Sequence, residues 1–276
     1  MYATYLDDAS FPEWAEKCEA DVRPVRVDLI RQRLIEVVSE TFDWALLLAA
    51  RVALADSREH PLDELIAVSG PAINAAVGLQ TRQVVHLSSG SVYETLTGKL
   101  GPHLALAPRL PYSVAKLAAE HLVNSVAEAP VRTVRFFGAY GPGEPDFKII
   151  RRMVDAFRRG QSEFSIRGDG SNRIDAMHIE DAAISLLNLA GLSGEGVLDL
   201  CQGESHTIRE FAHCVYEAVH PAPAAEPLRL RFDGEAHEQM HGEADPSQAD
   251  AVLKRRRRSL STGLQDYARW LASLES

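Results

Sequence analysis

Three residues in the middle of the chain, Ser89, Tyr112 and Lys116, have types and a spacing that suit proton transfer. Tyr112 and Lys116 are four positions apart, so on a helix both side chains leave the same face. A phenol titrates near pH 10 and is a poor base at neutral pH, but a neighbouring ammonium lowers its pKa by roughly 1–3 units. Tyr112 would then exchange a proton with a substrate hydroxyl or carbonyl, while the Ser89 hydroxyl holds that oxygen in place.

A buried strand and a helix are predicted to position these side chains. Val84–Leu87 is a short apolar run that ends in Ser88–Ser91, as expected for a parallel strand whose carboxyl end opens into a ligand crevice. Pro111 suits the first turn of a helix, because its missing N–H would have no partner there. We expect this helix to run to about Val126. A bare Tyr-x-x-x-Lys also occurs by chance on exposed helices, and the preceding strand with its Ser-Ser end favours the chemical interpretation.

Several motifs resemble the extended short-chain dehydrogenase/reductase family, the NAD-dependent epimerase/dehydratase type that acts on sugar nucleotides. They occur in the family's order and cover nearly the whole chain: Ser-Ser-Gly-Ser-Val-Tyr at 88–93, Tyr-Ser-Val-Ala-Lys at 112–116, Val134–Gly143, and Gly168–Ser171 followed by Asp175, His178 and Asp181. The resemblance implies an α/β fold with a Rossmann-like doubly wound parallel sheet. Residues 1–143 would form this dinucleotide-binding domain, and residues 144–276 a smaller α/β substrate domain with some return of the chain to the first.

The composition agrees with an enzyme that works in solution. The chain has 276 residues, enough for a large core, and a formal charge of −10, which argues against nucleic acid or an anionic membrane as a partner. No apolar run is long enough to span a bilayer and no signal-peptide pattern follows Met1, so we expect a cytoplasmic protein. The three cysteines are too scattered for a disulfide framework or a zinc site, and no metal is expected. The basic run Lys254–Arg258 is expected to be a solvated loop.

The first 50 residues alternate between expected strands and helices but lack a glycine-rich turn. Strands are expected at Tyr2–Asp8, Val22–Leu29 and Trp44–Ala50, with helices at Phe11–Ala20 and Ile30–Glu40, which predicts a parallel sheet. No glycine precedes Gly70. A dinucleotide-binding fold normally opens with a strand, a glycine-rich turn and a helix that receives the pyrophosphate. The family's first βα unit is therefore missing, and three explanations stay open: the sequence is truncated, the sheet has closed around the gap, or another chain fills it.

The family resemblance implies further site residues by position. Residues expected to bind the cofactor are Asp7, Asp28, Leu29, Leu48, Ala49, Ala50, Tyr112, Lys116 and Phe137, and residues expected to bind the substrate are Ser91, Tyr93, Gly138 and Arg173. Asp7 favours NAD over NADP, because a carboxylate repels a 2′-phosphate. Ile174 stands where the family has a phosphate-binding arginine, and Gly138 where many relatives have an asparagine. These departures leave open an unusual substrate, or one that is not a sugar nucleotide.

Two classes of function follow. In the first, a NAD-dependent sugar-nucleotide epimerase or ketoreductase, Tyr112 takes a proton from a substrate hydroxyl, Lys116 lowers the Tyr112 pKa and holds the nicotinamide ribose, and Ser89 positions the reacting oxygen. Gly90-Ser91 stand where dehydrating relatives carry Asp-Glu, which argues against a dehydratase. The second class is a cofactor-free relative: a ligand-binding or regulatory protein, or a lyase or isomerase using Tyr112 as acid and base. A homodimer through the Tyr-Lys helix is expected, although Leu117, Ala118 and Leu122 would equally fit packing on the sheet.

Overall fold

The computed structural model describes residues 1–8, 10–50, 58–220, 226–234, 241–254 and 257–274. The chain has the predicted mixed α/β architecture and folds as two compact units. Unit 1 comprises Met1–Ser88, Leu110–Thr133 and Ala190–Gly196, and unit 2 comprises Ser89–Arg109, Val134–Leu189 and Val197–Ser276. The chain thus passes repeatedly between the units, and the domain division expected at residue 143 stays a prediction.

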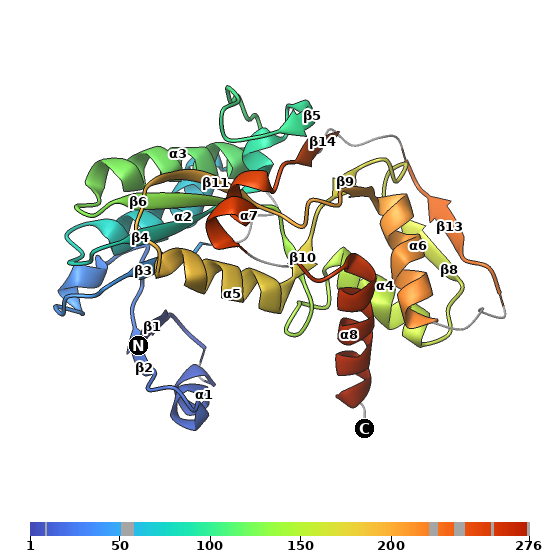
Figure 1. Cartoon of the computed structure of the whole chain (residues 1–276), viewed down its shortest axis with the longest axis horizontal. Coiled ribbons are helices and arrows are strands. Elements are labelled where there is room, and N and C mark those ends of the chain that lie inside the picture. The colour runs from blue at the N-terminus through green and yellow to red at the C-terminus, as the bar shows by residue number, and fades with distance from the viewer. Residues whose placement is uncertain (9, 51–57, 221–225, 235–240, 255–256, 275–276) are drawn as a thin grey trace. The chain divides into compact units, whose positions relative to one another are not determined.

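The helices and strands follow one another along the chain as labelled in Figure 1. In unit 1 the elements are β1 (Tyr2–Tyr5), α1 (Phe11–Lys17), β2 (Arg23–Arg26), η1 (Leu34–Glu36), β3 (Ala45–Leu47), α2 (Pro61–Ala76), β4 (Val84–Ser89), α3 (Pro111–Val126) and the start of β6 (Val131–Phe136). The remaining elements are η2 (Gly90–Tyr93), β5 (Thr97–Leu100), β7 (Ala139–Tyr140), α4 (Ile149–Arg158), β8 (Glu163–Ile166), β9 (Arg173–Ile174), β10 (Met177–His178), α5 (Ile179–Ala190), β11 (Gly196–Leu200), β12 (His206–Thr207), α6 (Ile208–Val219), β13 (Arg229–Phe232), β14 (His241–Ala244), α7 (Ser247–Leu253) and α8 (Leu260–Ser273).

The strands near the amino end belong to two separate sheets. Strand β1 pairs in parallel with β2, with Tyr2 opposite Arg23, and these two strands form a sheet of their own, drawn in dark blue in Figure 1. Strand β3 pairs in parallel with β4 in a four-stranded sheet of order β11-β6-β4-β3. The prediction that strands in this region pair in parallel is confirmed. In the described part of the chain, however, β1 and β2 do not join the sheet that contains β3.

The prediction of a helix at Ile30–Glu40 is wrong. Only the single 3-10 turn η1 forms there. The chain turns tightly after β2, because the Asp28 carbonyl accepts hydrogen bonds from both Arg31 N and Gln32 N, and the Asp28 carboxylate accepts one from Ile30 N. Arg33 then adopts an extended conformation with ψ 144°, which interrupts any continuous helix. The local turn is therefore more stable here than the helix that the apolar periodicity predicts.

Helices α2 and α3 pack against each other and cover the strands that lead to the predicted site. Both begin with a proline in the first turn, Pro61 and Pro111, as predicted for the second of them. The apolar core beneath them contains the buried residues Val27, Leu29, Leu47, Ala72, Ala75, Ala76, Val84, Val123 and Val131. Small alanines on α2 let the helix approach its neighbours closely, so α3 is held firmly relative to β4.

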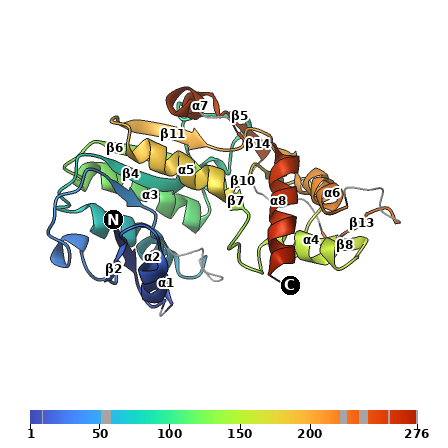
Figure 2. The same cartoon turned by 60° about the horizontal axis from the view of Figure 1, so that its bottom comes forward.

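Unit 2 is built around the helices α4, α6 and α8, which Figure 2 shows grouped together. Their buried aromatic residues Phe157, Phe211 and Tyr267 lie in one hydrophobic cluster. Strand β8 pairs in parallel with β13 and contributes Phe164 and Ile166 to the same cluster, and β5 pairs in parallel with β14. Among the described residues, no helix is long and apolar enough to cross a membrane.

The amino end of α6 carries a cap that its sequence predicts, because Glu210 follows Thr207 by three residues. The Thr207 hydroxyl accepts a hydrogen bond from Glu210 N at 3.1 Å, and the Glu210 carboxylate accepts one from Thr207 N at 2.8 Å. This reciprocal arrangement satisfies two backbone N–H groups that the helix itself cannot bond.

Thr207→Ala should lower the free energy of unfolding by about 1 kcal/mol, because it removes the acceptor for Glu210 N. Urea unfolding followed by circular dichroism measures this loss. Thr207→Ser retains the hydroxyl and should lose at most a few tenths of that amount. Equal losses in the two variants would contradict a role for the hydroxyl.

Candidate functional site

Tyr112 and Lys116 lie one helical turn apart in the first half of α3. Lys116 is 5% exposed, and its Nζ donates a hydrogen bond to the Leu87 carbonyl of β4 at 3.2 Å. Burial lowers the pKa of Lys116 to about 8, and attraction by Glu120 acts in the opposite direction. Tyr112 is half-buried. The structure thus fixes the ammonium against a strand end while the neighbouring phenol keeps some access to solvent.

A second row of polar side chains lies against Lys116 in the same unit. The Ser88 hydroxyl donates to the Glu120 carboxylate at 2.5 Å, and both residues are buried. His86 is buried as well, and its Nδ1 has no hydrogen-bond partner among the described residues. Burial, followed by the charge of Lys116, lowers the pKa of His86 to about 3. His86 is therefore neutral at physiological pH.

Beyond the end of β4, the Ser-Gly-Ser segment forms a short capped turn. The Ser89 hydroxyl accepts a hydrogen bond from Ser91 N at 3.1 Å and caps η2. The Ser91 hydroxyl is itself buried and has no hydrogen-bond partner in the described part of the chain. Because Ser89 Oγ accepts from the backbone, its own proton remains available for donation to another oxygen.

Tyr93, expected from the resemblance to bind substrate, is fully buried. Its hydroxyl donates to the Asp199 carboxylate at 2.9 Å and accepts from Arg135 Nη1 at 2.8 Å. Burial, and then the charge of Asp199, raises its pKa. The Phe137 ring stacks on the Tyr93 ring with the centroids 5.9 Å apart. Tyr93 is thus a buried support for the Phe137 ring.

Two glycines shape the backbone beside Phe137. A Cβ at Gly90 would come within 2.7 Å of the Phe137 ring, so only glycine fits there without displacement. Gly138 has φ 126°, a conformation that side chains disfavour, and its carbonyl accepts a hydrogen bond from Met177 N. The absence of a side chain at position 138, noted in the sequence as a departure from the family, therefore also meets a local backbone requirement.

Arg173, on β9, is fixed beside a polar pocket in unit 2. It donates to the Ser205 hydroxyl at 2.9 Å and to the Ser205 carbonyl at 2.6 Å, and it pairs with Glu243 at 3.1 Å. The pocket has a volume of about 290 Å³ and is lined by Lys99, Gly203, Ser205, Glu243, Ala244, Asp245 and Pro246. Both signs of charge therefore meet at this pocket.

The acidic residues expected to bind the cofactor follow β1 and β2, not the four-stranded sheet. Asp7 is exposed and pairs with Arg26 at 3.4 Å. Asp28 is half-buried; its carboxylate closes the turn after β2 and pairs with Arg31 at 3.5 Å. Leu29 is buried in the core under α2, where its backbone carbonyl accepts a hydrogen bond from Asn74 at 2.9 Å.

The segment after β3 presents an apolar surface. Leu48 and Ala49 are exposed and Ala50 is half-buried. An exposed apolar strand end suits a flat ring or ribose, so these three residues fit a cofactor contact. The residues present match NAD only in part, however. Residues 1–69 contain no glycine, so this part of the chain offers no glycine-rich turn for the pyrophosphate.

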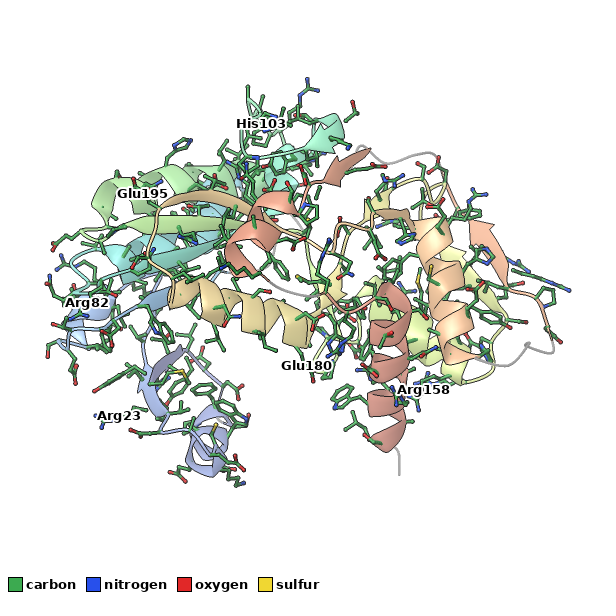
Figure 3. All side chains as sticks on the ribbon, viewed as in Figure 1. Arg23, Arg82, His103, Arg158, Glu180 and Glu195 are labelled. Carbon is green, nitrogen blue, oxygen red and sulfur yellow. The ribbon has the colours of Figure 1, made fainter. Side chains whose placement is uncertain are left out.

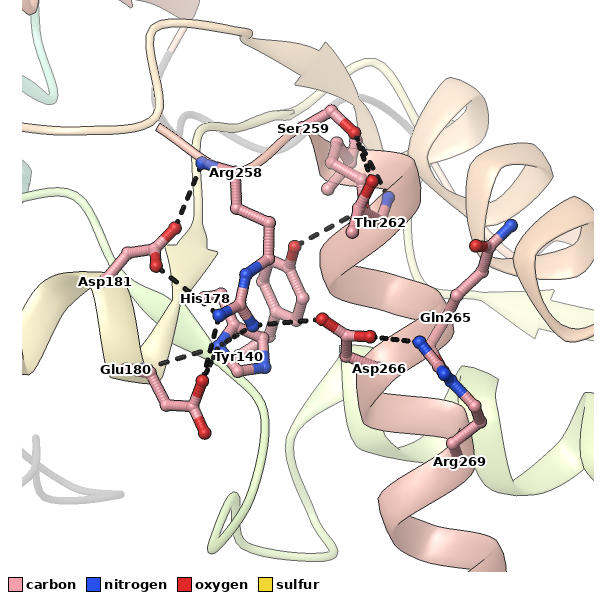
Figure 4. A network of polar contacts seen from close by, with 11 residues as sticks. Tyr140, His178, Glu180, Asp181, Arg258, Ser259, Thr262, Gln265, Asp266 and Arg269 are labelled. Carbon is pink, nitrogen blue, oxygen red and sulfur yellow. Dashed lines mark hydrogen bonds and ion pairs between the residues drawn. The ribbon is translucent and has the colours of Figure 1, made fainter. Parts of the chain in front are cut away.

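Some buried charges could not be foreseen in the sequence. Exposed pairs such as Arg23 with Asp21 and Arg82 with Asp43 lie on the surface, where Figure 3 labels the two arginines, and water screens their attraction. Arg258, in contrast, is 24% exposed and bonds to His178 Nδ1 at 3.0 Å (Figure 4).

The Arg258 guanidinium also pairs with three carboxylates, Glu180 at 2.9 Å, Asp266 at 3.2 Å and Asp181 at 3.7 Å (Figure 4). Its backbone N donates to Asp181 as well, at 3.2 Å. Arg257 pairs with Asp250 at 3.0 Å. The sequence predicts a solvated loop at Lys254–Arg258, but Arg257 and Arg258 are half-buried and form ion pairs, so the prediction is wrong for these two residues. Arg255 and Arg256 lie outside the described residues. No local pattern signals this network, because Arg258 and Asp181 are 77 positions apart.

Comparison with known proteins identifies the family. The chain belongs to the NAD dependent epimerase/dehydratase family, whose model matches residues 8–193. The family resemblance seen in the sequence is thereby confirmed.

Relatives of established name match parts of the chain. The low-salt glycan biosynthesis protein Agl12 of Haloferax volcanii is 30% identical over 153 residues, which are 53% of this chain and 49% of Agl12, so the chain spans about half the length of that relative. GDP-6-deoxy-D-mannose reductase of Pseudomonas aeruginosa is 26% identical over 226 residues, 75% of this chain and 74% of the reductase.

The structure of MoeE5 in complex with UDP-glucose and NAD superposes with a TM-score of 0.75 at 26% identity, covering 93% of this chain and 88% of MoeE5. This likeness confirms the predicted α/β fold with a Rossmann-like parallel sheet.

Lys116 should make the stability of the protein rise with pH between about 8 and 10.5. Its pKa is about 8 in the folded protein, against an ordinary value of 10.5. In this window the unfolded chain binds more protons than the folded one, so the free energy of unfolding increases, by up to about 3 kcal/mol in total. Urea unfolding at a series of pH values measures the rise.

Lys116→Met should abolish this rise, because it removes the titrating group. Lys17→Met, at an exposed position on α1, is the matched control and should keep it. A slope that is the same with and without Lys116 would show that another group is responsible.

Proposed function

We propose that the protein is a NAD-dependent sugar-nucleotide epimerase or ketoreductase in which Tyr112 transfers the proton. The observation that carries the proposal is the buried Lys116, hydrogen-bonded to the Leu87 carbonyl one helical turn from Tyr112 in a member of this family. A fixed ammonium beside a phenol favours the phenolate. The relatives named as reductase and the MoeE5 complex with UDP-glucose and NAD support the substrate class.

Tyr112, Lys116 and Ser89 have separate roles in the proposed proton transfer. Tyr112 accepts the proton of a substrate hydroxyl, and Lys116 stabilises the phenolate on either side of that transfer. Ser89 donates its hydroxyl proton to the reacting oxygen, since its lone pair is already bonded to Ser91 N. When bound, NAD would accept a hydride from the carbon that carries this hydroxyl, and NADH would supply one to a carbonyl carbon. In an epimerase the hydride would return to the opposite face of the transient ketone. In a ketoreductase Tyr112 would instead donate its proton to the carbonyl oxygen, and the product would leave after that one transfer.

Unit 2 carries the proposed substrate contacts. Arg173, beside the pocket lined by Lys99 and Ser205, offers a guanidinium to an anionic part of the substrate, and an anion would compete with Glu243 for it. Ser91 is a proposed substrate contact through its hydroxyl, and Gly138 through its backbone, which no side chain covers. Tyr93 would act from behind, through Phe137.

Unit 1 carries proposed cofactor contacts, which follow the ends of its strands. Leu48, Ala49 and Ala50 offer an apolar contact, and Asp7 a carboxylate for a ribose hydroxyl. Asp7 favours NAD. Its partner Arg26 would attract a 2′-phosphate, so NADP is the second candidate.

Tyr112→Phe should reduce turnover of the accepted sugar nucleotide at least about 100-fold, because no other group replaces the phenol as acid and base. A panel of UDP-, dTDP- and GDP-sugars, followed by nicotinamide absorbance and by product analysis for epimers, identifies the substrate. NADH affinity, measured by nicotinamide fluorescence, should stay within a few-fold of the parent protein. Undiminished turnover in Tyr112→Phe, or no NADH binding at millimolar concentration, would overturn the proposal.

A second candidate function is a cofactor-free lyase or isomerase, or a ligand-binding protein. It is favoured by the absence of glycine from residues 1–69 and by the separation of β1 and β2 from the four-stranded sheet. The two candidates differ in one measurement. Conversion of a sugar nucleotide by protein freed of nicotinamide, abolished in Tyr112→Phe, identifies the lyase or isomerase.

We further propose a homodimer formed through α2 and α3. Apolar side chains on the two helices are exposed: Leu62 by 70%, Ile66 by 53%, Val114 by 44% and Leu122 by 44%. Within each helix the positions repeat at multiples of four residues, so they form a stripe. Such a stripe on two packed helices suits association with the same stripe of a second copy.

The double variant Leu62→Glu, Leu122→Glu should elute as a monomer in size-exclusion chromatography with light scattering, because charges cannot be buried without partners. Leu274→Glu, at an exposed position beyond α8, is the control and should leave the mass unchanged. Circular dichroism checks that both variants are folded. A parent protein that is monomeric at micromolar concentration would refute the dimer.

A further inference from the structure

Tyr112, Lys116 and Glu120 form one column along α3. They are spaced four residues apart, so all three side chains leave the same face of the helix. On β4, His86 and Ser88 are two residues apart and point to one side of the strand. The helix face and the strand face meet within unit 1, where Lys116 bonds to the carbonyl of Leu87 and Ser88 bonds to Glu120.

The contact between this helix face and β4 excludes water. Lys116 and Glu120 are each 5% exposed, Ser88 is 3% exposed and His86 is 1% exposed. A buried ammonium is stable only with hydrogen bonds and a nearby opposite charge. The Leu87 carbonyl supplies a hydrogen bond to Lys116 but no charge, so the opposite charge must come from a carboxylate.

Glu120 is the carboxylate that acts on Lys116. The titratable groups that face Lys116 are His86 from β4 and Tyr112 and Glu120 from its own helix, and His86 is neutral at physiological pH. Helix α2, packed against α3, contributes the buried Glu64 to this unit. Attraction by Glu120 raises the Lys116 pKa against the effect of burial.

We propose that Glu120 is a positioning residue of the Tyr112–Lys116 site: Ser88 fixes its carboxylate, and the carboxylate keeps Lys116 protonated. The inference rests on the proposed proton transfer for its meaning in catalysis. The link from Ser88 through Glu120 to Lys116 is a property of the folded chain alone. Without the carboxylate, the buried amine loses its proton near neutral pH and no longer stabilises a phenolate at Tyr112.

The test measures the titration of Lys116 directly. The chain has five lysines, so NMR of protein labelled with ¹³C at the lysine ε carbon gives few signals, and Lys116→Arg assigns the one of interest. In Glu120→Gln, which retains an oxygen for the Ser88 hydroxyl but no charge, the Lys116 pKa should fall by about 1 unit or more from its value in the parent protein. Ser88→Ala keeps the charge but removes the hydrogen bond that fixes the carboxylate, so that pKa should fall by less than in Glu120→Gln.

An unchanged Lys116 titration in Glu120→Gln would overturn the proposal, and so would an equal shift in Ser88→Ala and Glu120→Gln. If Glu120→Gln does not fold, Glu120→Met, which removes the charge with an apolar side chain of similar length, tests the same coupling and should lower the Lys116 pKa in the same direction. These titrations need neither cofactor nor substrate. Loss of the proposed function, seen as full turnover in Tyr112→Phe, is therefore distinguishable from loss of the Glu120 coupling.

Discussion

The burial of one ammonium group constrains the arrangement around the predicted site. Lys116 lies where water is excluded, and removing a charge from water costs several kcal/mol unless the charge is hydrogen-bonded and compensated. Both requirements fix α3 against β4: the Leu87 carbonyl bonds to the amine, and Glu120, held by Ser88, compensates its charge. The packing of α2 on α3 and the proline start of α3 then position Tyr112.

In unit 2, too, buried or half-buried charged groups are hydrogen-bonded and paired with opposite charges. Tyr93 bridges Arg135 and Asp199 in the interior, and Arg258 bonds to His178, Glu180 and Asp266. Each cluster joins segments that are far apart in the chain, since Tyr93 and Asp199 are 106 positions apart. Removing one member breaks hydrogen bonds in a partly or fully buried cluster, which costs more than an exposed pair contributes. These clusters therefore specify how distant segments of unit 2 meet.

The sequence predicts those features that depend on local chemistry. Proline at the start of α3, the Thr207–Glu210 cap and the apolar run of β4 each impose a conformation on a few neighbouring residues, and each is present. The helix expected at Ile30–Glu40 is absent, because the Asp28 turn competes with it. The ion pairs of Arg258 depend on tertiary contacts that no local pattern records. Glu120 could have been recognised, because it continues the four-residue spacing of Tyr112 and Lys116 by one more turn.

The proposed cofactor contacts differ in how closely they are tied to the Lys116 site. Asp7 and Asp28 follow strands of the two-stranded sheet formed by β1 and β2, whereas the Leu87 carbonyl that bonds to Lys116 belongs to β4. Leu48, Ala49 and Ala50, in contrast, follow β3, which pairs with β4. A substitution at Asp7 is therefore expected to change cofactor affinity without changing the charge state of Lys116, since the two depend on different packing contacts. A substitution at Leu48 has no such independence, because the strand before it pairs with the strand that holds Lys116.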